Sequence, residues 1–534
     1  MDVVDIWTGH RANALRVALR MTNESFAQHL GTAVRTVAKW NAQPDLVPVS
    51  ELQRALDTAL SHASDTERAR FALLVSRSEP TTPSRHTSDQ GAIDGGAADL
   101  RLAHDPAIND ALHWLDSRAG WPSGETRRRI RADFHALNPD SLDALARRRS
   151  NISGVQRAKA LEDYYNVGTT GLYRFYTALC DGVRCTTSVL TKPDWLDLNL
   201  PLGQGKDHLT LISDIPSPPQ DPLSEPAISA AVRRLAEALA IGTHMTNAPL
   251  YRLLHVNASY QGLDGSVGLT SFLDYALTLD LLENELTDAL SRGHSAIPGT
   301  LPLRDVYLPD TRAIVDLEHR LCVGGPLALI AIARPPGRRR NTPRDYVFLI
   351  QERSAKVLNA TGQLAVIPKA FHQPLVDFSD DAQLSATIER EMEEELFGRP
   401  EVDSTGGAQR SADPMHISRV SEPMRWLMGH ASAEVWRIEC VGFGVNAMTG
   451  TFEFASLIII NDENWWDIYS GAIEGNWETE GLQRYSSLNR DTFAALVRHQ
   501  AWSPEGLFAF LQATRRLAQI GGERVRLPPI EPEI

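Results

Sequence analysis

Apolar residues between positions 13 and 42 recur at helical spacing in three successive groups. Spacings of three and four residues place side chains on one side of a helix. The pattern therefore predicts three short helices, each with one buried face, and Gly31 marks a turn before the third. The expected buried faces are Leu15, Ala18 and Leu19; Phe26, Ala27 and Leu30; and Val34, Val37 and Trp40.

The stretch that follows this helical segment marks a domain boundary. Residues 81–96 read TTPSRHTSDQGAIDGG and lack a regular hydrophobic period. Small, polar and glycine-rich sequences of this kind behave as flexible linkers. We therefore expect an all-α first domain at residues 1–80 and a flexible linker at residues 81–100.

Residues 101–298 have a mostly helical pattern, with a more extended stretch from Cys185 to Ile215. Aromatic residues gather before and within this stretch. Core packing is the simpler explanation for them, and a ligand pocket is the alternative. We expect an α-rich middle domain at residues 101–298, with a role that the pattern does not indicate. The aromatic residues are Tyr164, Tyr165, Tyr173, Phe175, Tyr176 and Trp195.

The pattern changes to β near Pro298. Apolar runs of strand length at 327–333 and 346–350 flank a turn-rich loop, and two more runs flank residues 448–450. The second pair, 435–445 and 451–460, completes two predicted hairpins. One helix is expected between the hairpins at 384–397, and another begins after Ser503 and ends at Gly521. The fold class is therefore multidomain α+β, with an α/β sandwich at residues 299–534.

The composition limits the classes of function that the chain can have. The 534 residues carry a formal net charge of −14, so the chain as a whole is not a general binder of polyanions. No apolar run reaches the ~20 residues that a membrane-spanning helix needs, and residues 1–7 do not resemble a signal peptide. We therefore expect a cytoplasmic protein without membrane contact. The four cysteines fit neither a disulfide framework nor a zinc site and are expected to be buried thiols.

Basic residues gather in the first domain in spite of the acidic balance. In the third predicted helix, Arg35, Thr36 and Lys39 lie opposite the apolar face. Arginine can donate paired hydrogen bonds to guanine, and lysine in such a position suits a phosphate. These three residues are therefore our candidates for binding double-stranded DNA. Between residues 11 and 39 a single acid, Glu24, accompanies five basic residues: Arg11, Arg16, Arg20, Arg35 and Lys39.

This segment resembles the Cro-repressor-like, or XRE, family of helix-turn-helix domains. The matching residues are Phe26-Ala-Gln-His-Leu-Gly31, Thr36-Val37 and Trp40, whereas Asn41 stands where the family usually has Glu. The resemblance implies a transcriptional regulator that binds an operator as a homodimer. A small helical bundle that binds protein is the alternative.

A second motif with chemical content lies in the predicted helix at 384–397. Glu391, Glu394 and Glu395 are spaced i, i+3 and i+4, which places three carboxylates on one side of an α-helix. Carboxylates so arranged repel one another unless a cation neutralises them, and hard oxygen ligands suit Mg²⁺ or Mn²⁺. The spacing predicts a divalent-cation site that would hold a diphosphate group. A solvated, charged helix face is the alternative.

The segment Arg390-Glu-Met-Glu-Glu-Glu-Leu-Phe-Gly398 resembles the second half of the Nudix box. The resemblance implies a Nudix-like domain in which the three glutamates bind metal and Arg390 orients them and contacts the ligand. The first half of the box is absent, because Ala382 and Val376 stand where the family has Glu and Gly. A ligand-binding domain without turnover and an active hydrolase both remain open. A further acidic residue for hydrolysis would come from Glu474, Glu478 or Glu480.

Together these features predict a sequence-specific regulator whose Nudix-like domain senses a small phosphorylated ligand, such as a nucleotide or another diphosphate. Its layout also resembles that of regulators from actinobacteria. A Nudix-type phosphohydrolase with an accessory helix-turn-helix domain is the alternative. A protein-interaction scaffold with neither activity is the third hypothesis.

Overall fold

The chain forms two compact units, Met1–Gln90 and Gly91–Ile534. The predicted linker at 81–100 and the predicted turn at Gly31 lie outside the residues that the structure describes. This computed structural model describes residues 7–533 except 20, 31, 33, 43–45, 49–51, 54, 57, 58, 61–70, 72–101, 103, 104, 137, 138, 167–170, 204, 217–221, 242, 244, 338–342, 355–361, 400–414, 431, 477 and 478.

The first unit contains the three predicted helices: α1 (Gly9–Ala18), α2 (Asn23–Leu30) and α3 (Val34–Ala42). Threonine side chains cap the first two. Thr8 accepts a hydrogen bond from the backbone nitrogen of Arg11 at 3.3 Å, and Thr22 accepts one from that of Ser25 at 3.1 Å. The third helix packs against both others. The prediction of three short helices is confirmed.

One residue of the predicted core of this unit is wrongly placed. Val37 and Trp40 are 1% exposed, but Val34 is 43% exposed. Each step of three residues along an α-helix falls about 60° short of a full turn, so Val34 lies about 120° around the helix from Trp40. The buried face of α3 therefore includes Val37 and Trp40 and leaves Val34 at its edge.

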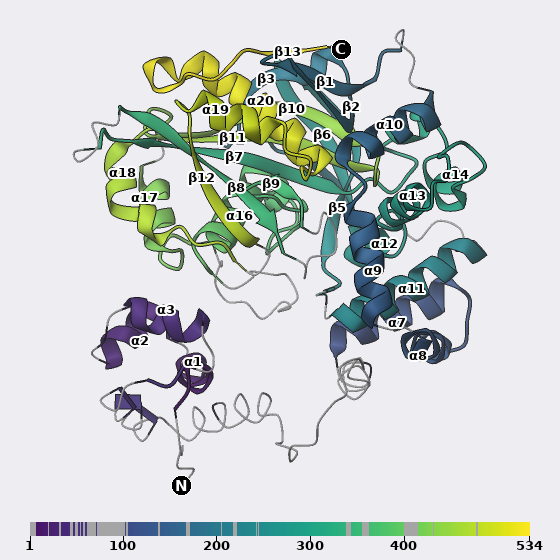
Figure 1. Ribbon diagram of the computed structural model, residues 1–534, viewed down its shortest axis with the longest axis horizontal. Coiled ribbons are helices and arrows are strands. Elements are labelled where there is room, and N and C mark those ends of the chain that lie inside the picture. The colour runs from purple at the N-terminus through teal and green to yellow at the C-terminus, as the bar shows by residue number, and fades with distance from the viewer. Residues whose placement is uncertain are drawn as a thin grey trace. The chain divides into compact units, whose positions relative to one another are not determined.

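The second unit combines many helices with two sheets (Figure 1). No helix among the described residues is long and apolar enough to span a membrane. The helices are α7 (Pro106–Arg118), α8 (Glu125–Ala136), α9 (Pro139–Ser150), α10 (Gly154–Tyr165), α11 (Glu225–Ile241), α12 (Phe272–Ala276), α13 (Leu281–Ser291), α14 (Pro302–Tyr307), α15 (Thr311–Val315), α16 (Leu384–Glu391), α17 (Glu422–Gly429), α18 (Glu463–Tyr469), α19 (Arg490–Val497) and α20 (Pro504–Ile520).

In the part of the chain that the structure describes, ten strands form the main sheet, and three form a smaller one. The main sheet has the order β12-β8-β7-β11-β10-β2-β1-β13, with β3 beside β10 and β9 beside β8; the smaller has the order β4-β6-β5. The strands are β1 (Arg174–Cys180), β2 (Val183–Thr191), β3 (Leu196–Pro201), β4 (Thr210–Pro216), β5 (Pro249–Ser259), β6 (Gly262–Ser271), β7 (Gly324–Arg334), β8 (Asp345–Arg353), β9 (Leu364–Val366), β10 (Trp436–Asn446), β11 (Thr451–Ile460), β12 (Thr479–Ser486) and β13 (Ile530–Pro532).

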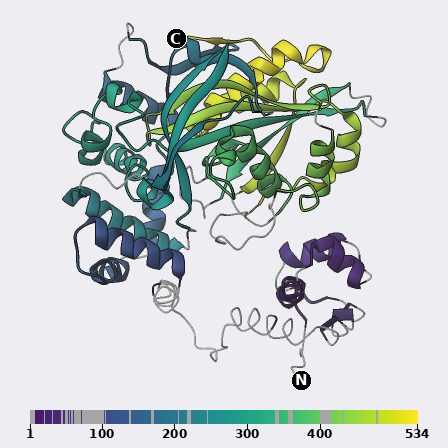
Figure 2. The ribbon, with the colours of Figure 1, turned by 180° about the vertical axis from the view of Figure 1, so that it is seen from behind.

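Helices cover both faces of the main sheet. On β7, Leu327 and Leu329 pack into the core shared with α20, whereas Ala328 and Ile330 pack into the core shared with α16 and α17. Figure 1 shows α20 across the near face, and Figure 2 shows the green α16 on the other. A strand buried on both faces needs apolar side chains at every position, which explains the continuous apolar runs.

The element predictions for the C-terminal region are confirmed. β7 and β8 pair antiparallel, as do β10 and β11, and these are the two predicted hairpins. In addition, β7 and β11 pair parallel to each other at the centre of the sheet. Ser503 caps α20 through a hydrogen bond from the backbone nitrogen of Gly506, and the helix ends at Ile520, before Gly521. The mixed α and β composition is also as predicted.

The region expected to form an α-rich middle domain contributes strands to the same main sheet. Strands β1, β2 and β3 come from residues 174–201, and β2 pairs with β10 through Val189 and Leu190. Residues on either side of position 298 therefore share one hydrogen-bonded sheet and one compact unit. The sequence pattern missed this because apolar strand runs do not reveal which strands pair.

Candidate functional site

Helix α3 carries the candidate DNA-binding residues on its outer side. Arg35 and Lys39 are exposed and Thr36 is half-buried, while Val37 and Trp40 are buried on the inner side. These positions follow from the helical period, which separates the two faces. The structure thus presents two basic side chains to solvent from a helix that is fixed along its other side.

The turn between α1 and α2 is tied by Arg16. Its Nη1 donates to the backbone oxygen of Met21 at 2.8 Å, and its Nε donates to Asn13 Oδ1 at 3.0 Å. Arg16 is one of the five basic residues between positions 11 and 39, but two of its donors are engaged within the protein. The exposed basic surface of this unit is therefore narrower than the sequence count suggests, and Arg35 and Lys39 are its members on α3.

The second candidate site is the end of α16, where the helix widens. Residues Met392–Leu396 form a π-helical turn that continues α16. Such turns use i→i+5 hydrogen bonds and shift the following side chains around the axis. The i, i+3 and i+4 spacing of Glu391, Glu394 and Glu395 therefore does not place them as it would on an α-helix.

Arg390 lies between two of the predicted carboxylates. Its Nη2 is 3.0 Å from Glu391 Oε1, and its Nε is 3.9 Å from Glu394 Oε1. Its Nη1 donates to the backbone oxygen of Gln373 at 3.2 Å. All three side chains are buried. The structure therefore brings Arg390, Glu391 and Glu394 together, and the alternative of a solvated charged face is wrong.

The other two glutamates of this turn face different partners. Glu395 accepts a hydrogen bond from the backbone nitrogen of Lys369 at 2.9 Å. Glu393 accepts from the backbone nitrogen and the hydroxyl of Ser421, at 2.6 and 2.7 Å. The carboxylates of this turn are thus distributed among separate donors of the protein.

The predicted divalent cation would need a different arrangement of these side chains. The guanidinium of Arg390 lies between Glu391 and Glu394 and supplies one positive charge to these two carboxylates. Within the described part of the chain, no three His, Cys, Asp or Glu side chains are grouped to hold a metal ion. As it stands, the site does not fit Mg²⁺ or Mn²⁺, and the cation remains a prediction.

The sequence offered Glu474, Glu478 and Glu480 as a further acidic residue for hydrolysis, and Glu474 lies next to the π-helical turn Met392–Leu396. The backbone nitrogen of Glu474 donates to the backbone oxygen of Leu396 at 3.0 Å, although its side chain is exposed. Glu478 and the side chain of Glu480 lie outside the described residues.

A buried polar network adjoins α16 that the sequence analysis did not predict. Lys369 Nζ donates to Glu505 Oε1 at 2.6 Å, and Asn446 Nδ2 donates to Glu505 Oε2 at 3.1 Å. Glu453 accepts from the hydroxyl of Thr451 at 2.7 Å. A sequence signal existed, because Glu453 interrupts the apolar run of a strand that is buried on both faces.

Burial sets the charge states in and near this network. Burial and the neighbouring Glu505 raise the pKa of Glu453 to about 8. Burial raises the pKa of Glu505, but the ammonium of Lys369, together with hydrogen bonds from the backbone and from Ser503, outweighs burial, and the pKa of Glu505 is lowered. Burial and the guanidinium of Arg390 lower the pKa of His372 to about 3, so this imidazole is neutral at pH 7. One lysine therefore compensates one of the two carboxylates, and Glu453 keeps its proton.

No protein-family model matches this chain, and no curated protein matches it in sequence.

Proposed function

We propose that this protein is a sequence-specific DNA-binding regulator. The observation that carries the proposal is the division of α3 into a buried face with Val37 and Trp40 and an exposed face with Arg35 and Lys39. A recognition helix needs both, because one side must be held by the domain while the other enters the major groove.

The order of residues along α3 suits this role. In helix-turn-helix proteins, the N-terminal residues of the second helix of the motif contact base edges. Arg35 is the second residue of α3 and suits paired hydrogen bonds to guanine, whereas Lys39 lies one turn later and suits a phosphate. We propose Thr36 as an additional contact. Binding as a homodimer to two half-sites of an operator belongs to the same proposal.

We further propose that the second unit regulates DNA binding by sensing a small ligand. The succession of two hairpins with α16 between them supports a Nudix-like fold, and the contacts among Arg390, Glu391 and Glu394 support the resemblance of this motif. Ligand binding would shift the equilibrium between conformations that differ in DNA affinity.

Selection of DNA from a random pool by the full-length protein tests the proposal. We expect an enriched sequence, and we expect Arg35→Ala to lose preference at one base pair at a cost of ~1 to 3 kcal/mol. Lys39→Gln should weaken binding to all sequences and reduce the salt dependence by about one counterion. Arg128→Gln, an exposed substitution on α8, is the matched control and should leave the selected sequence unchanged.

Two results would refute the proposal. One is a pool without enrichment, which would favour the scaffold hypothesis. The other is an Arg35→Ala variant that selects the same sequence with the same affinity as the unmodified protein.

A phosphohydrolase is the second candidate function. The presence of Arg390, Glu391 and Glu394 in one helical segment supports it, because the Nudix resemblance assigns these residues to the reaction, and Arg390 would have to leave the carboxylates before a cation could bind them. The test is incubation with Mg²⁺ or Mn²⁺ and a set of nucleoside diphosphate derivatives. Turnover that Glu394→Gln abolishes would establish an enzyme, and absence of turnover across the set would leave the regulator.

A further inference from the structure

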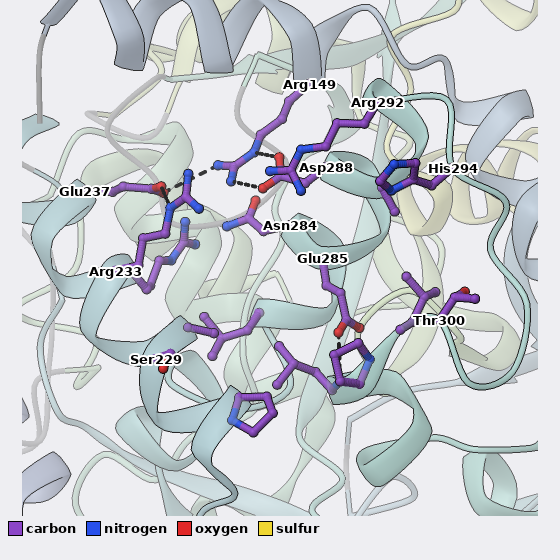
Figure 3. A pocket seen from close by; sticks show the side chains of 18 residues that line it. Arg149, Ser229, Arg233, Glu237, Asn284, Glu285, Asp288, Arg292, His294 and Thr300 are labelled. Atoms are coloured by element: carbon purple, nitrogen blue, oxygen red, sulfur yellow. Dashed lines mark hydrogen bonds and ion pairs between the residues drawn. The ribbon is translucent and has the colours of Figure 1, made fainter. Parts of the chain in front are cut away.

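A pocket of about 380 Å³ lies in the second unit, between α9, α11, α13 and the segment that leads into α14 (Figure 3). It shares no lining residue with the end of α16. Sites for small molecules commonly enclose about 300 to 1,000 Å³. The pocket is therefore large enough for a small ligand and separate from the motif that the sequence singled out.

One wall of the pocket is a row of alternating charges. Arg149 donates to both carboxylate oxygens of Asp288, at 2.7 and 2.9 Å, and its Nη1 lies 3.4 Å from Glu237. Glu237 also accepts from the Nε of Arg233 at 3.2 Å. Figure 3 shows Glu237, Arg149, Asp288 and Arg292 following one another along this wall. The two carboxylates are already engaged, and they hold Arg149 in a fixed position.

The row carries one positive charge in excess. It contains three arginines, Arg149, Arg233 and Arg292, and two carboxylates, those of Glu237 and Asp288, so 3 − 2 = +1. Among the described residues, the guanidinium of Arg292 makes no ion pair or hydrogen bond, and Arg233 uses one of its donors. Arg149 uses three N–H donors in this row, so Arg292 and Arg233 keep the larger share of unused donors. Guanidinium groups bind carboxylate and phosphate through paired hydrogen bonds.

The remaining charged groups of the pocket are committed elsewhere. Glu285 accepts the backbone nitrogens of Leu303 and Arg304, at 2.7 and 3.0 Å, and thereby fixes the start of α14. Arg234 is paired with the buried Asp280 at 2.6 Å. Asp280 compensates the charge of Arg234, whereas Glu285 is held by backbone donors, which carry no net charge. The excess of one positive charge therefore belongs to the row of charges and not to the pocket as a whole.

The rest of the lining combines apolar side chains with four polar ones, Ser229, Asn284, His294 and Thr300. Its apolar part includes two prolines and side chains from α11, α13 and α14, and these would contact an aliphatic or aromatic body rather than a polar one. The apolar lining residues are Pro226, Ala230, Leu281, Ala289, Leu301, Pro302 and Leu303.

We propose that this pocket binds a small amphipathic anion. Arg292 and Arg233 hold its carboxylate or phosphate group, and its apolar part lies against Leu281, Leu301 and Leu303. That this ligand regulates DNA binding rests on the proposed function. That the pocket binds the anion does not depend on it.

Calorimetric titration of the full-length protein tests the proposal without DNA. The probes are straight-chain carboxylates from butanoate to decanoate, the alkyl phosphates of the same lengths, and the neutral alcohols as controls. We expect saturable binding of at least one anion series, affinity that rises with chain length until the pocket is filled, and no binding of the alcohols. The two anion series distinguish a carboxylate ligand from a phosphate ligand.

Arg292→Gln removes the excess charge without disturbing a pair within the described part of the chain. We expect at least tenfold weaker binding, as for the loss of one hydrogen bond to a charged group. Arg128→Gln on α8 removes the same charge outside the pocket and should leave the affinity unchanged. Absence of saturable binding, or equal affinity in Arg292→Gln and the unmodified protein, would overturn the proposal. The selection of DNA from a random pool does not depend on the binding of an anion. Failure of the pocket proposal would therefore leave the proposal of DNA binding intact, and the reverse also holds.

Discussion

Helices α3 and α16 both carry charged motifs, but they place the charges in opposite surroundings. Arg35 and Lys39 of α3 are exposed, whereas Arg390 of α16 is 3% exposed and lies between Glu391 and Glu394. An exposed cation keeps its donors available for a phosphate or a base. A buried ion pair has already exchanged water for its partner, and breaking it costs free energy. Charge in a motif therefore indicates binding only where the fold leaves it accessible.

The largest expected effect concerns the buried side of α3. Trp40→Ala should reduce the stability of the first unit by roughly 3 to 5 kcal/mol, because it removes a large side chain that is 1% exposed. Hydrogen exchange of residues 9–42 in the full-length protein would measure the change, and DNA binding should be lost with the fold. Val34→Ala is the control on the same helix, and its exposed side chain predicts a change within about 0.5 kcal/mol. Similar exchange rates in both variants would contradict the division of α3 into two faces.

Removing one arginine from each of the two helices should affect stability unequally. Arg390→Met should lower the free energy of unfolding of the second unit by about 3 kcal/mol, because two buried carboxylates lose their counter-charge. Arg35→Ala should change stability by less than about 0.5 kcal/mol. Denaturant unfolding of both variants measures the difference.

Two further measurements separate charge from packing at α16. Adding Glu391→Gln and Glu394→Gln to Arg390→Met should restore most of the lost stability, since the repulsion disappears. Mg²⁺ should stabilise Arg390→Met more than the unmodified protein if a cation can occupy the position of the guanidinium. A triple variant that is no more stable than Arg390→Met would show that the loss comes from packing.

A smaller effect is expected from pH. Unfolded glutamate loses its proton near 4.5, whereas Glu453 keeps it to about 8, so the folded state holds more protons between these values. Stability should then fall as pH rises, by at most about 2 kcal/mol between pH 6.5 and 8. Below pH 6.5 the neutral His372 acts in the opposite direction, because the unfolded histidine takes up a proton there. Glu453→Gln should flatten the decline, measured by unfolding at several pH values, and an unchanged slope would remove Glu453 as its cause.

Most of the helices and strands could be predicted because the sequence patterns that indicate them lie within the elements themselves. The apolar run of β7 and the Ser503-Pro504 start of α20 each fix a strand or a helix from neighbouring residues alone. The pairing of β2 with β10 was not predictable, since it joins residues about 250 positions apart. The helical period of α3 also explains the exposure of Val34. It does so only once the structure shows that Val37 and Trp40 lie on the buried face.

The candidate sites show the same limit more strongly. The exposure of Arg35 and Lys39 could be predicted because both lie on one helix, whose period separates its buried and exposed faces. The widening of α16 at Met392–Leu396 leaves no mark in the pattern of glutamates, and it separates Glu395 from the others. The pocket beside Arg292 is assembled from residues 149 to 303, each unremarkable in its own segment. Such sites depend on tertiary contacts, which one sequence does not contain.

The pairing of β1 with β13 has a consequence for synthesis of the chain. Cys180 lies opposite Ile530, so 350 residues must be added after the first strand before its partner exists. At translation rates of about 5 to 20 residues per second, that edge stays open on the ribosome for roughly 20 to 70 s. Open strand edges invite pairing with other chains. Until that edge is covered, nascent copies of this protein on one messenger RNA are therefore more exposed to pairing with each other than the finished protein is.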